Sequence, residues 1–495
     1  MRTLLALLAL AAATMHPSRT EGAARPNLVL IVVDDMGWQD TSVPFHSEVT
    51  ALNRRYRTPA MERLAAEGAK LTDAHASAVC SPSRVSLLTG MSAARHGVTN
   101  WTLHRDRGPD QPHPSLEMPE WPVNGLAPVP GTPRTVVARC LPELLSEAGY
   151  RTVHVGKAHF GAKGTPGEDP RNLGFDVNVA GHAAGGPGSY WAEKGYSARW
   201  RGDTGVWDVP GLEAHKAAGT YLTEALTLEA AKAVEAAVAE GKPFFLHLAH
   251  YAVHAPWETD PRFAAPYEAA GLKGRELALA TMIEGVDKSV GDILALLDRL
   301  GVAGNTLVVL VSDNGAPAEV PRNLPLRGHK LTPFEGGSRV PALVRWPGKV
   351  RPGLVDATPV VIEDLFPTLL EAAGVHFAGK IPQVVDGRSW IPHLTGGPKL
   401  PADRPLVFHF PNNYGGQGPF SALRAGEWKL IFHHASGALE LHDLSRDIGE
   451  SRDLAARRPD KARELAAVLA RELEARGALM PRRRSDGRPV AVPVR

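Results

Sequence analysis

Short, continuously apolar runs alternate along the chain with longer segments of helical periodicity. The clearest apolar runs cover residues 28–33, 152–155, 244–249 and 307–311. Between them, hydrophobic residues recur with helical spacing in segments 59–68, 141–149, 221–240 and 276–300. Strands that are apolar on both faces and separated by helices are typical of a parallel sheet covered on two sides. The pattern predicts an α/β fold with a large mixed, mostly parallel sheet sandwiched by helices.

Two long segments lack any sustained period. Residues 100–135 and 161–220 are rich in Gly, Pro, Trp and His. Such segments run over the surface, and in α/β enzymes they often shape the substrate entrance. The first domain, residues 25–397, is therefore predicted to be an α/β domain with extended loops that could border a substrate site.

The pattern changes near Pro398. Segments 421–432 and 439–444 are typical of strands, and the charged, Ala- and Leu-rich segment 460–476 is typical of a helix. We expect residues 398–495 to form a C-terminal subdomain with a small four-stranded antiparallel sheet, a terminal helix and a solvated basic tail around Arg482, Arg483 and Arg484.

The first residues have the pattern of a secretory signal peptide. Met1-Arg2-Thr3 gives a charged start, and residues 4–13 are apolar. That run is too short to span a bilayer, and no later stretch approaches the roughly 20 apolar residues required. A buried first helix is the alternative, although the polar stretch that follows could not pack behind it. We predict a signal peptide over residues 1–24 and an exported protein, periplasmic or secreted, without a membrane span.

Charge and cysteine content narrow the class of protein. The 55 Lys and Arg residues against 53 Asp and Glu leave a net charge of +2 over 495 residues, which gives no sign of a nucleic-acid-binding surface. The two cysteines, Cys80 and Cys140, could form one disulfide in an exported protein. A chain of this length does not need one, so a separate chemical role for one cysteine is equally open.

Polar residues follow each apolar run. Asp34 and Asp35 come after the first run, and Lys157 and His159 after the second. The third is followed by His250 and His254, and the fourth by the segment Ser312-Asp313-Asn314-Gly315. Ligands bind beyond the carboxyl ends of the strands in open parallel sheets. The sequence therefore predicts one site at this edge.

The acidic residues of this edge suggest a metal. Asp34, Asp35, Asp313 and Asn314 offer only oxygen ligands, which Ca²⁺ or Mg²⁺ prefers over the softer donor set of zinc. Carboxylates crowded at strand ends would repel one another without a cation among them. The alternative is that the Asp34-Asp35 pair caps a turn or helix, but the second pair favours a metal site.

Cys80 is predicted to lie at the start of a helix. Pro82 is placed where a helix begins and Gly90 where one ends. A helix N-terminus favours an anion and lowers the pKa of a thiol, so a thiolate nucleophile is the first functional interpretation. A small buried hydrophobic residue is the structural alternative.

The segment from Cys80 to Gly90 resembles the maturation signature of type I sulfatases. It reads Cys-x-Pro-x-Arg and closes on Thr89-Gly90, so all five fixed positions are met. The resemblance to these arylsulfatase-like members of the alkaline phosphatase superfamily runs from about Pro26 to Leu454. It includes the segments Gly156-Lys157-Ala158-His159, His254-Ala255-Pro256, Gly328-His329-Lys330, Glu427-Trp428-Lys429-Leu430 and Leu441-His442-Asp443-Leu444.

The resemblance implies a chemistry for Cys80. In that family a maturation enzyme oxidises the cysteine to formylglycine, and one hydroxyl of the hydrated aldehyde attacks sulfur. The second hydroxyl then allows sulfate to be expelled, which a serine could not do. The resemblance further implies a metal, Ca²⁺ rather than Mg²⁺, held by Asp34, Asp35, Asp313, Asn314 and an oxygen of the modified Cys80.

The remaining site roles are also implied by the resemblance. Arg84 would steady the aldehyde hydrate, and His159 would contact it and accept its proton. Lys157 and Lys330 would bind sulfate oxygens, and His254 would hold sulfate or protonate the leaving oxygen. His182 lies in a glycine-rich loop that the family uses near the substrate. Alone, each of these residues would more often be a surface charge or a structural histidine.

The expected substrate is a sulfate ester, with a sulfated glycan favoured over a small aryl or lipid sulfate. Sugars stack on aromatic faces, and five tryptophans fall in or near the predicted loops: Trp101, Trp191, Trp200, Trp207 and Trp257. A formylglycine-dependent phosphodiesterase or phosphonate monoester hydrolase is the nearest alternative. A non-catalytic carbohydrate-binding relative is another, although every site residue is present.

Overall fold

The computed structural model describes residues 25–494. The predicted signal peptide, residues 1–24, lies outside the described residues. No helix within residues 25–494 has both the length and the apolar character needed to cross a membrane.

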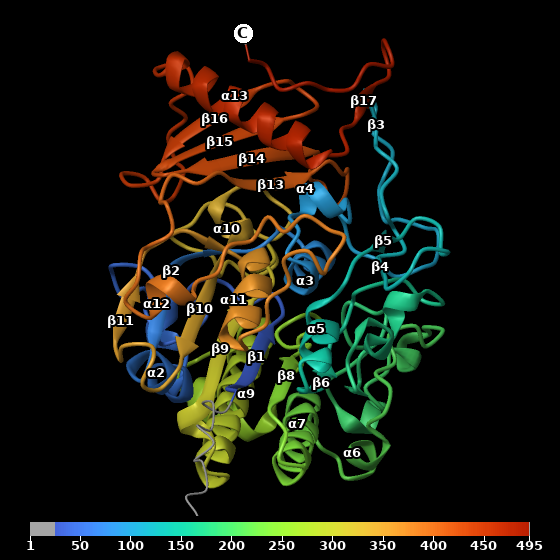
Figure 1. Cartoon of the computed structure of the whole chain (residues 1–495), viewed down its shortest axis with the longest axis vertical. Coiled ribbons are helices and arrows are strands. Elements are labelled where there is room, and N and C mark those ends of the chain that lie inside the picture. Colours follow the sequence, from blue (N-terminus) through green and yellow to red (C-terminus); the bar gives the residue numbers. More distant parts are fainter. Residues whose placement is uncertain (1–24, 495) are drawn as a thin grey trace, which may run out of the picture.

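A nine-stranded mixed sheet forms the centre of the larger domain (Figure 1). The strands β9 (Thr306–Ser312), β1 (Asn27–Val33), β8 (Phe244–Ala249), β6 (Arg151–Gly156) and β7 (Val177–Val179) run parallel in this order. Beyond β9, β10 (Arg339–Arg345) is antiparallel to β9 and to β2 (Ala69–His75). The short strands β11 (Leu354–Asp356) and β12 (Val360–Val361) pair in parallel with β2. The predicted mixed, mostly parallel sheet is confirmed.

Helices cover both faces of this sheet because its central strands are apolar on both faces. Val29 and Ile31 of β1 belong to one buried cluster, which includes residues of α2 (Pro59–Ala66), α7 (Leu222–Ala239) and α9 (Gly274–Arg299). The intervening Leu28 and Leu30 belong to another, with residues of α3 (Cys80–Thr89), α5 (Leu141–Glu147) and α11 (Leu365–Ala372). Alternation along one strand therefore builds two cores.

Several further helices and strands of the described chain are short. The shorter helices of the chain are α1 (Ala51–Arg55), α4 (Ala93–His96), α6 (Glu213–Ala217), α8 (Ala264–Ala269), α10 (Glu335–Ser338) and α12 (Ile391–Leu394). Two-residue strands occur at β3 (Leu116–Glu117), β4 (Leu126–Ala127) and β5 (Val136–Val137).

A four-stranded antiparallel sheet stands above one end of the central sheet (Figure 1). Its strands are β13 (Leu406–Phe410), β14 (Phe420–Ala425), β15 (Trp428–His433) and β16 (Leu439–Asp443), in chain order. The segment predicted as one strand over 421–432 is two strands, since the chain turns at Gly426 with a φ of +59°. Helix α13 (Pro459–Arg476) covers the outer face. Rather than a free tail, Arg482–Arg483 forms β17, which pairs with β3.

Buried ion pairs connect the small sheet to the larger domain. Lys429 on β15 lies 2.9 Å from Glu335, which also accepts from Arg339 at 2.7 Å. Asp73 on β2 is paired with Arg339 at 3.0 Å and with Arg424 on β14. These pairs fix the small sheet against the segment that follows Lys330, a predicted site residue.

Candidate active site

The strand order brings the predicted site residues to one edge. Asp34 and Asp313 leave the paired strands β1 and β9, where Val33 is in register with Ser312 and the Asp313 N–H donates to the Val33 carbonyl at 3.3 Å. Lys157 directly follows β6, and its N–H donates to the carbonyl of Ala249, the last residue of β8, at 2.7 Å. The carboxyl ends of β9, β1, β8 and β6 therefore supply neighbouring side chains, as predicted.

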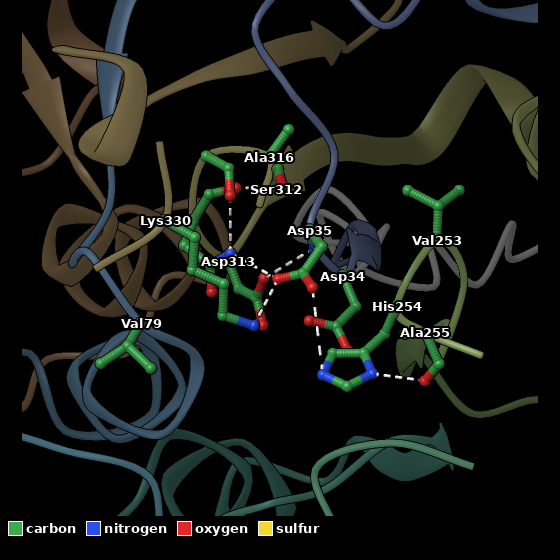
Figure 2. Close-up of polar contacts among 12 residues, drawn as sticks. Asp34, Asp35, Val79, Val253, His254, Ala255, Ser312, Asp313, Ala316 and Lys330 are labelled. Atoms are coloured by element: carbon green, nitrogen blue, oxygen red, sulfur yellow. Dashed lines mark hydrogen bonds and ion pairs between the residues drawn. The ribbon is translucent and has the colours of Figure 1, made fainter. Parts of the chain in front are cut away.

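Three carboxylates converge at this edge. Asp34, Asp35 and Asp313 each offer an oxygen, and these oxygens all lie within 4.8 Å of one another. The Asp35 N–H donates to Asp313 Oδ1 at 3.3 Å (Figure 2), and Asn314 Nδ2 donates to Asp35 Oδ1 at 2.6 Å. Four of the five predicted metal ligands, all except Cys80, thus form one buried cluster.

Two oxygens of this cluster have no hydrogen-bond partner among the described residues. They are Oδ1 of Asp34 and Oδ1 of Asn314, and both side chains are fully buried. Burial and the nearby Asp313 raise the pKa of Asp34 above its usual value. Unpaired buried oxygens are costly and usually have a functional reason, and a cluster of hard oxygen donors fits Ca²⁺ or Mg²⁺.

Each carboxylate is also paired with a cation. Lys157 Nζ lies 2.5 Å from Asp34 Oδ2. Lys330 Nζ lies 2.6 Å from Asp35 Oδ1 (Figure 2). Although burial alone would raise it, Lys330 and His254 hold the pKa of Asp35 below its usual range. Burial would likewise lower the pKa of Lys330, but Asp35 reverses this effect and raises it.

Cys80 is the first residue of α3 and is buried. Both cysteines are free, so a disulfide between Cys80 and Cys140 is excluded, and Cys140 lies in the core as one alternative expected. The expectation of a lowered thiol pKa at the helix N-terminus is wrong. Burial raises the pKa of Cys80 despite the positive charges of Lys157 and Lys330. The unmodified thiol is therefore a poor nucleophile here.

Arg84 is one helical turn after Cys80 and is 1% exposed. Its Nε lies 2.8 Å from Asp313 Oδ2, and its Nη1 donates to the Lys157 carbonyl at 2.8 Å. A surface salt bridge is thus excluded. The guanidinium joins the helix that carries Cys80 to the ends of β9 and β6.

Two imidazoles flank the cluster. His159 Nε2 is 2.7 Å from the Thr102 carbonyl, while its buried Nδ1 has no hydrogen-bond partner among the described residues. His254 Nδ1 is 2.7 Å from the Ala255 carbonyl, and its Nε2 lies 3.9 Å from Asp35 Oδ2 (Figure 2). Burial lowers the pKa of His254 to about 4, and burial together with Lys157 lowers that of His159.

Adjacent glycines in the 181–186 loop allow it to lie against both rings. A Cβ at Gly185 would be 2.4 Å from His159 Cε1, and one at Gly186 would be 2.7 Å from His254 Nδ1. The side chain of His182, from the same loop, is not among the described residues that line the site cavity. The backbone carbonyl of His182 accepts a hydrogen bond from the backbone N–H of His159 at 3.2 Å. A substrate contact by the His182 imidazole stays a prediction.

A cavity of about 600 Å³ opens beside Cys80. Asp35, His159, His254 and Lys330 line it, together with three of the five tryptophans considered above: Trp101, Trp207 and Trp257. Of the other two, Trp200 is 55% exposed and Trp191 donates to the Thr259 carbonyl.

Further lining residues that escaped prediction or were left uncommitted include Glu319, His329, Tyr414 and Gly415. Tyr414 lies in the β13–β14 loop of the small sheet. The sequence signal that could have found it is the loop-type run Asn412-Asn413-Tyr414-Gly415-Gly416 between two strands.

A mixed α/β sheet with acidic residues after two adjacent strands, beside a buried cysteine that begins a helix, defines a hydrolase of the alkaline-phosphatase-like fold. The sulfatase family model matches residues 26–375, and the C-terminal model of N-sulphoglucosamine sulphohydrolase matches residues 329–478. The chain belongs to the sulfatase family and is a sulfuric ester hydrolase.

Known proteins agree with this assignment. N-acetylgalactosamine-6-sulfatase of Mus musculus is 33% identical over 82% of this chain and 71% of its own length. Steryl-sulfatase of the same species is 31% identical over 94% of this chain and 85% of its own length. Among solved structures, Ps i-CgsB in complex with k-i-k-neocarrahexaose has a TM-score of 0.74 and 26% identity, covering 91% of this chain and 93% of the other.

Proposed function

We propose that this sulfatase hydrolyses a sulfate ester of a carbohydrate, with formylglycine derived from Cys80 as the nucleophile and Ca²⁺ as the metal. The observation that carries the proposal is the cluster of Asp34, Asp35, Asp313 and Asn314 next to Cys80, in which two buried oxygens have no described hydrogen-bond partner. These four residues would hold the cation, which when bound supplies Lewis-acid stabilisation of negative charge on oxygen.

The charges of the site favour an anionic substrate once a cation is bound. Three carboxylates, those of Asp34, Asp35 and Asp313, face three cationic groups, those of Lys157, Lys330 and Arg84. A divalent ion would make this group net positive, so the carboxylates would bind the metal while the two lysines turn toward sulfate oxygens. Both lysines would thereby orient the sulfate and stabilise its developing charge.

The two histidines would handle protons. The His254 ring lines the cavity, with Nδ1 held by the Ala255 carbonyl and Nε2 directed toward Asp35. Because Nδ1 already donates to the Ala255 carbonyl, Nε2 could donate to the leaving oxygen from the doubly protonated imidazole, whose second proton Asp35 would stabilise. Nδ1 of His159 has no described partner and could accept a proton from the nucleophile. Arg84 would position Asp313 and the start of α3 through Nε and Nη1. Its buried Nη2, which is ion-paired with Asp313 but has no hydrogen-bond partner among the described residues, could contact the modified Cys80.

Formylglycine at Cys80 would suit this buried position better than a thiol. A buried thiol that resists ionisation would be a weak nucleophile, whereas formylglycine supplies an oxygen nucleophile that needs no thiolate. A sugar substrate is supported by the half-buried tryptophans of the cavity and by the named substrate of the mouse N-acetylgalactosamine-6-sulfatase.

Two measurements on purified protein test the proposal. Mass spectrometry of the Cys80 peptide should find formylglycine, and sulfated mono- and oligosaccharides should be hydrolysed in preference to aryl phosphate or phosphonate esters. A C80A variant should fold but release no sulfate. Full activity with an unmodified thiol would refute the nucleophile. Preferential phosphorus chemistry, or hydrolysis of aryl sulfates without any sulfated sugar, would refute the substrate.

A further inference from the structure

One wall of the site cavity is aromatic and is built by both parts of the chain. Trp101 follows α4 in the large domain, and Tyr414 lies in the β13–β14 loop of the small sheet. Their ring centroids are 5.7 Å apart with an interplanar angle of 70°. Both rings are partly exposed and pack against a buried cluster that contains Cys80. The wall therefore stands directly beside the predicted nucleophile.

Trp207 continues the same wall. Trp101 and Trp207 both pack on the small cluster of Leu103, Ala183 and Ala184, and both line the cavity. Trp101 thus contacts Tyr414 and shares this cluster with Trp207. Because the Trp101 and Tyr414 rings are steeply inclined to each other, one ring face can stack on the apolar C–H face of a sugar while the other ring borders the edge of that sugar.

Asp110 holds the Trp101 and Tyr414 segments together. Its Oδ1 accepts from Asn412 Nδ2 at 2.9 Å and from Asn100 Nδ2 at 3.4 Å, and each asparagine lies within two residues of one of the rings. The Trp121 indole donates to Oδ2 at 2.6 Å. The backbones also meet, since the Gln111 N–H donates to the Asn413 carbonyl at 2.8 Å. Asp110 therefore sets the spacing of the two rings.

The cavity offers little to a second anionic group. Among the described residues that line it, Lys330 is the one Lys or Arg, and in the proposed function it already binds the sulfate. Glu319 adds a negative charge to the lining. A ring that carries a carboxylate besides its sulfate would find no further Lys or Arg among these lining residues, and the charge of Glu319 would disfavour it.

We infer that Trp101 and Tyr414 form a subsite for the apolar face of an uncharged sugar ring that bears the sulfate ester, with Asp110 as its positioning residue. The subsite depends on the proposed carbohydrate sulfatase function. It also gives the small C-terminal sheet a direct part in substrate selection.

Steady-state kinetics of the mature enzyme on sulfated hexoses and N-acetylhexosamines test this subsite. W101A and Y414A should each lower kcat/KM at least about tenfold, mainly through KM, because ground-state and transition-state binding are lost together. W101F and Y414F keep a ring and should retain most activity. The matched control is W200A, since Trp200 is exposed and outside the cavity. D110N, which keeps one acceptor, should lower kcat/KM less than D110A.

Competitive inhibition by inorganic sulfate separates the subsite from the sulfate-binding groups. The inhibition constant of sulfate should stay within about twofold in W101A and Y414A, since sulfate lacks a ring. If W101A, Y414A and W200A all hydrolyse the sugar sulfates with the wild-type kcat/KM, the subsite is overturned, whereas the proposed function stays intact. Faster turnover of a sulfated uronate than of any uncharged sugar would overturn the preference for an uncharged ring. Failure of the wild-type enzyme on every sulfated sugar would instead overturn the proposed function, and the subsite with it.

Discussion

The guanidinium of Arg84 contacts one oxygen of Asp313 through two nitrogens, with Nε at 2.8 Å and Nη2 at 2.7 Å from Oδ2. The pair is almost fully buried, at 1% and 0% side-chain exposure. It joins the helix that begins with Cys80 to the strand that ends at a predicted metal ligand. The nucleophile and the metal cluster are therefore held in one rigid unit.

Loss of this pair should destabilise the fold. R84M leaves the Asp313 carboxylate buried without its partner, which costs about 3–5 kcal/mol. R84K keeps the charge but cannot also reach the Lys157 carbonyl, so R84K should lose less stability than R84M. Thermal unfolding measures both, with R446M as an exposed-arginine control that should stay near wild type. An R84M variant with wild-type Tm would contradict the structural role.

Calcium should stabilise the folded enzyme measurably. A ligand at about 100 times its Kd adds about 2.7 kcal/mol, so Tm should rise by a few degrees between chelator and excess Ca²⁺. N314A removes a neutral oxygen donor and should weaken this shift, whereas N172A, on the surface, should not. A Ca²⁺-independent Tm in the wild type, or a larger shift with Zn²⁺, would count against the metal assignment.

Replacing Cys80 by serine should trap a reaction intermediate. A serine hydroxyl can attack sulfur but has no second hydroxyl with which to expel sulfate. Intact-mass spectrometry of C80S after incubation with substrate should show one added sulfate group per chain and less than one turnover. Continued multiple turnover by C80S would show that the second hydroxyl is dispensable.

Gly185 should be required for the position of His159. A Cβ there would lie 2.4 Å from Cε1 of the His159 ring, and that ring is also fixed by the Thr102 carbonyl. G185A should therefore lower kcat at least about tenfold, as displacement of a group near the reacting atoms does. G304A is the matched control, because nothing lies within 4 Å of a Cβ at that glycine. Equal kcat in the two variants would contradict this close approach.

Asp287 should make stability depend on pH. It accepts from the N–H groups of Ala60 and Met61 at the start of α2, and burial raises its pKa to about 7. Between pH of about 4 and about 7, Asp287 keeps its proton in the folded chain and releases it in the unfolded chain. The contribution of Asp287 to the free energy of unfolding therefore falls as the pH rises through this range. The Tm of D287N relative to wild type should therefore increase between about pH 5 and about pH 8. A difference that is constant, or that shrinks with pH, would contradict the raised pKa.

The sequence predicted the central fold well because its signals are local. Continuous apolar runs at 28–33 and 307–311 marked strands that are buried on both faces, and β1 and β9 occupy them. The small sheet was predicted less accurately. Its segment 421–432 reads as a continuous strand, and the break at Gly426 depends on the backbone turning left-handed there.

The site was predictable where its residues follow strands or fall in one motif. Asp34, Asp35, Asp313 and Asn314 needed only the rule that polar groups at carboxyl ends meet at one edge. The pKa of Cys80 was predicted in the wrong direction, because the helix N-terminus is visible in sequence but burial is not. Tyr414 and Asp110 were missed for a related reason, since their partners lie hundreds of residues away or in another domain.

The amino-acid sequence alone thus determined the α/β class, the edge that carries the chemistry and the cysteine that begins α3, since periodicity and motif spacing are properties of neighbouring residues. Only the tertiary structure decided which cation pairs with which carboxylate, that the Cys80 thiol is buried, and that a loop of the small sheet completes the cavity. Those features depend on distances and on exclusion of water between segments far apart in the chain, and no local pattern encodes them.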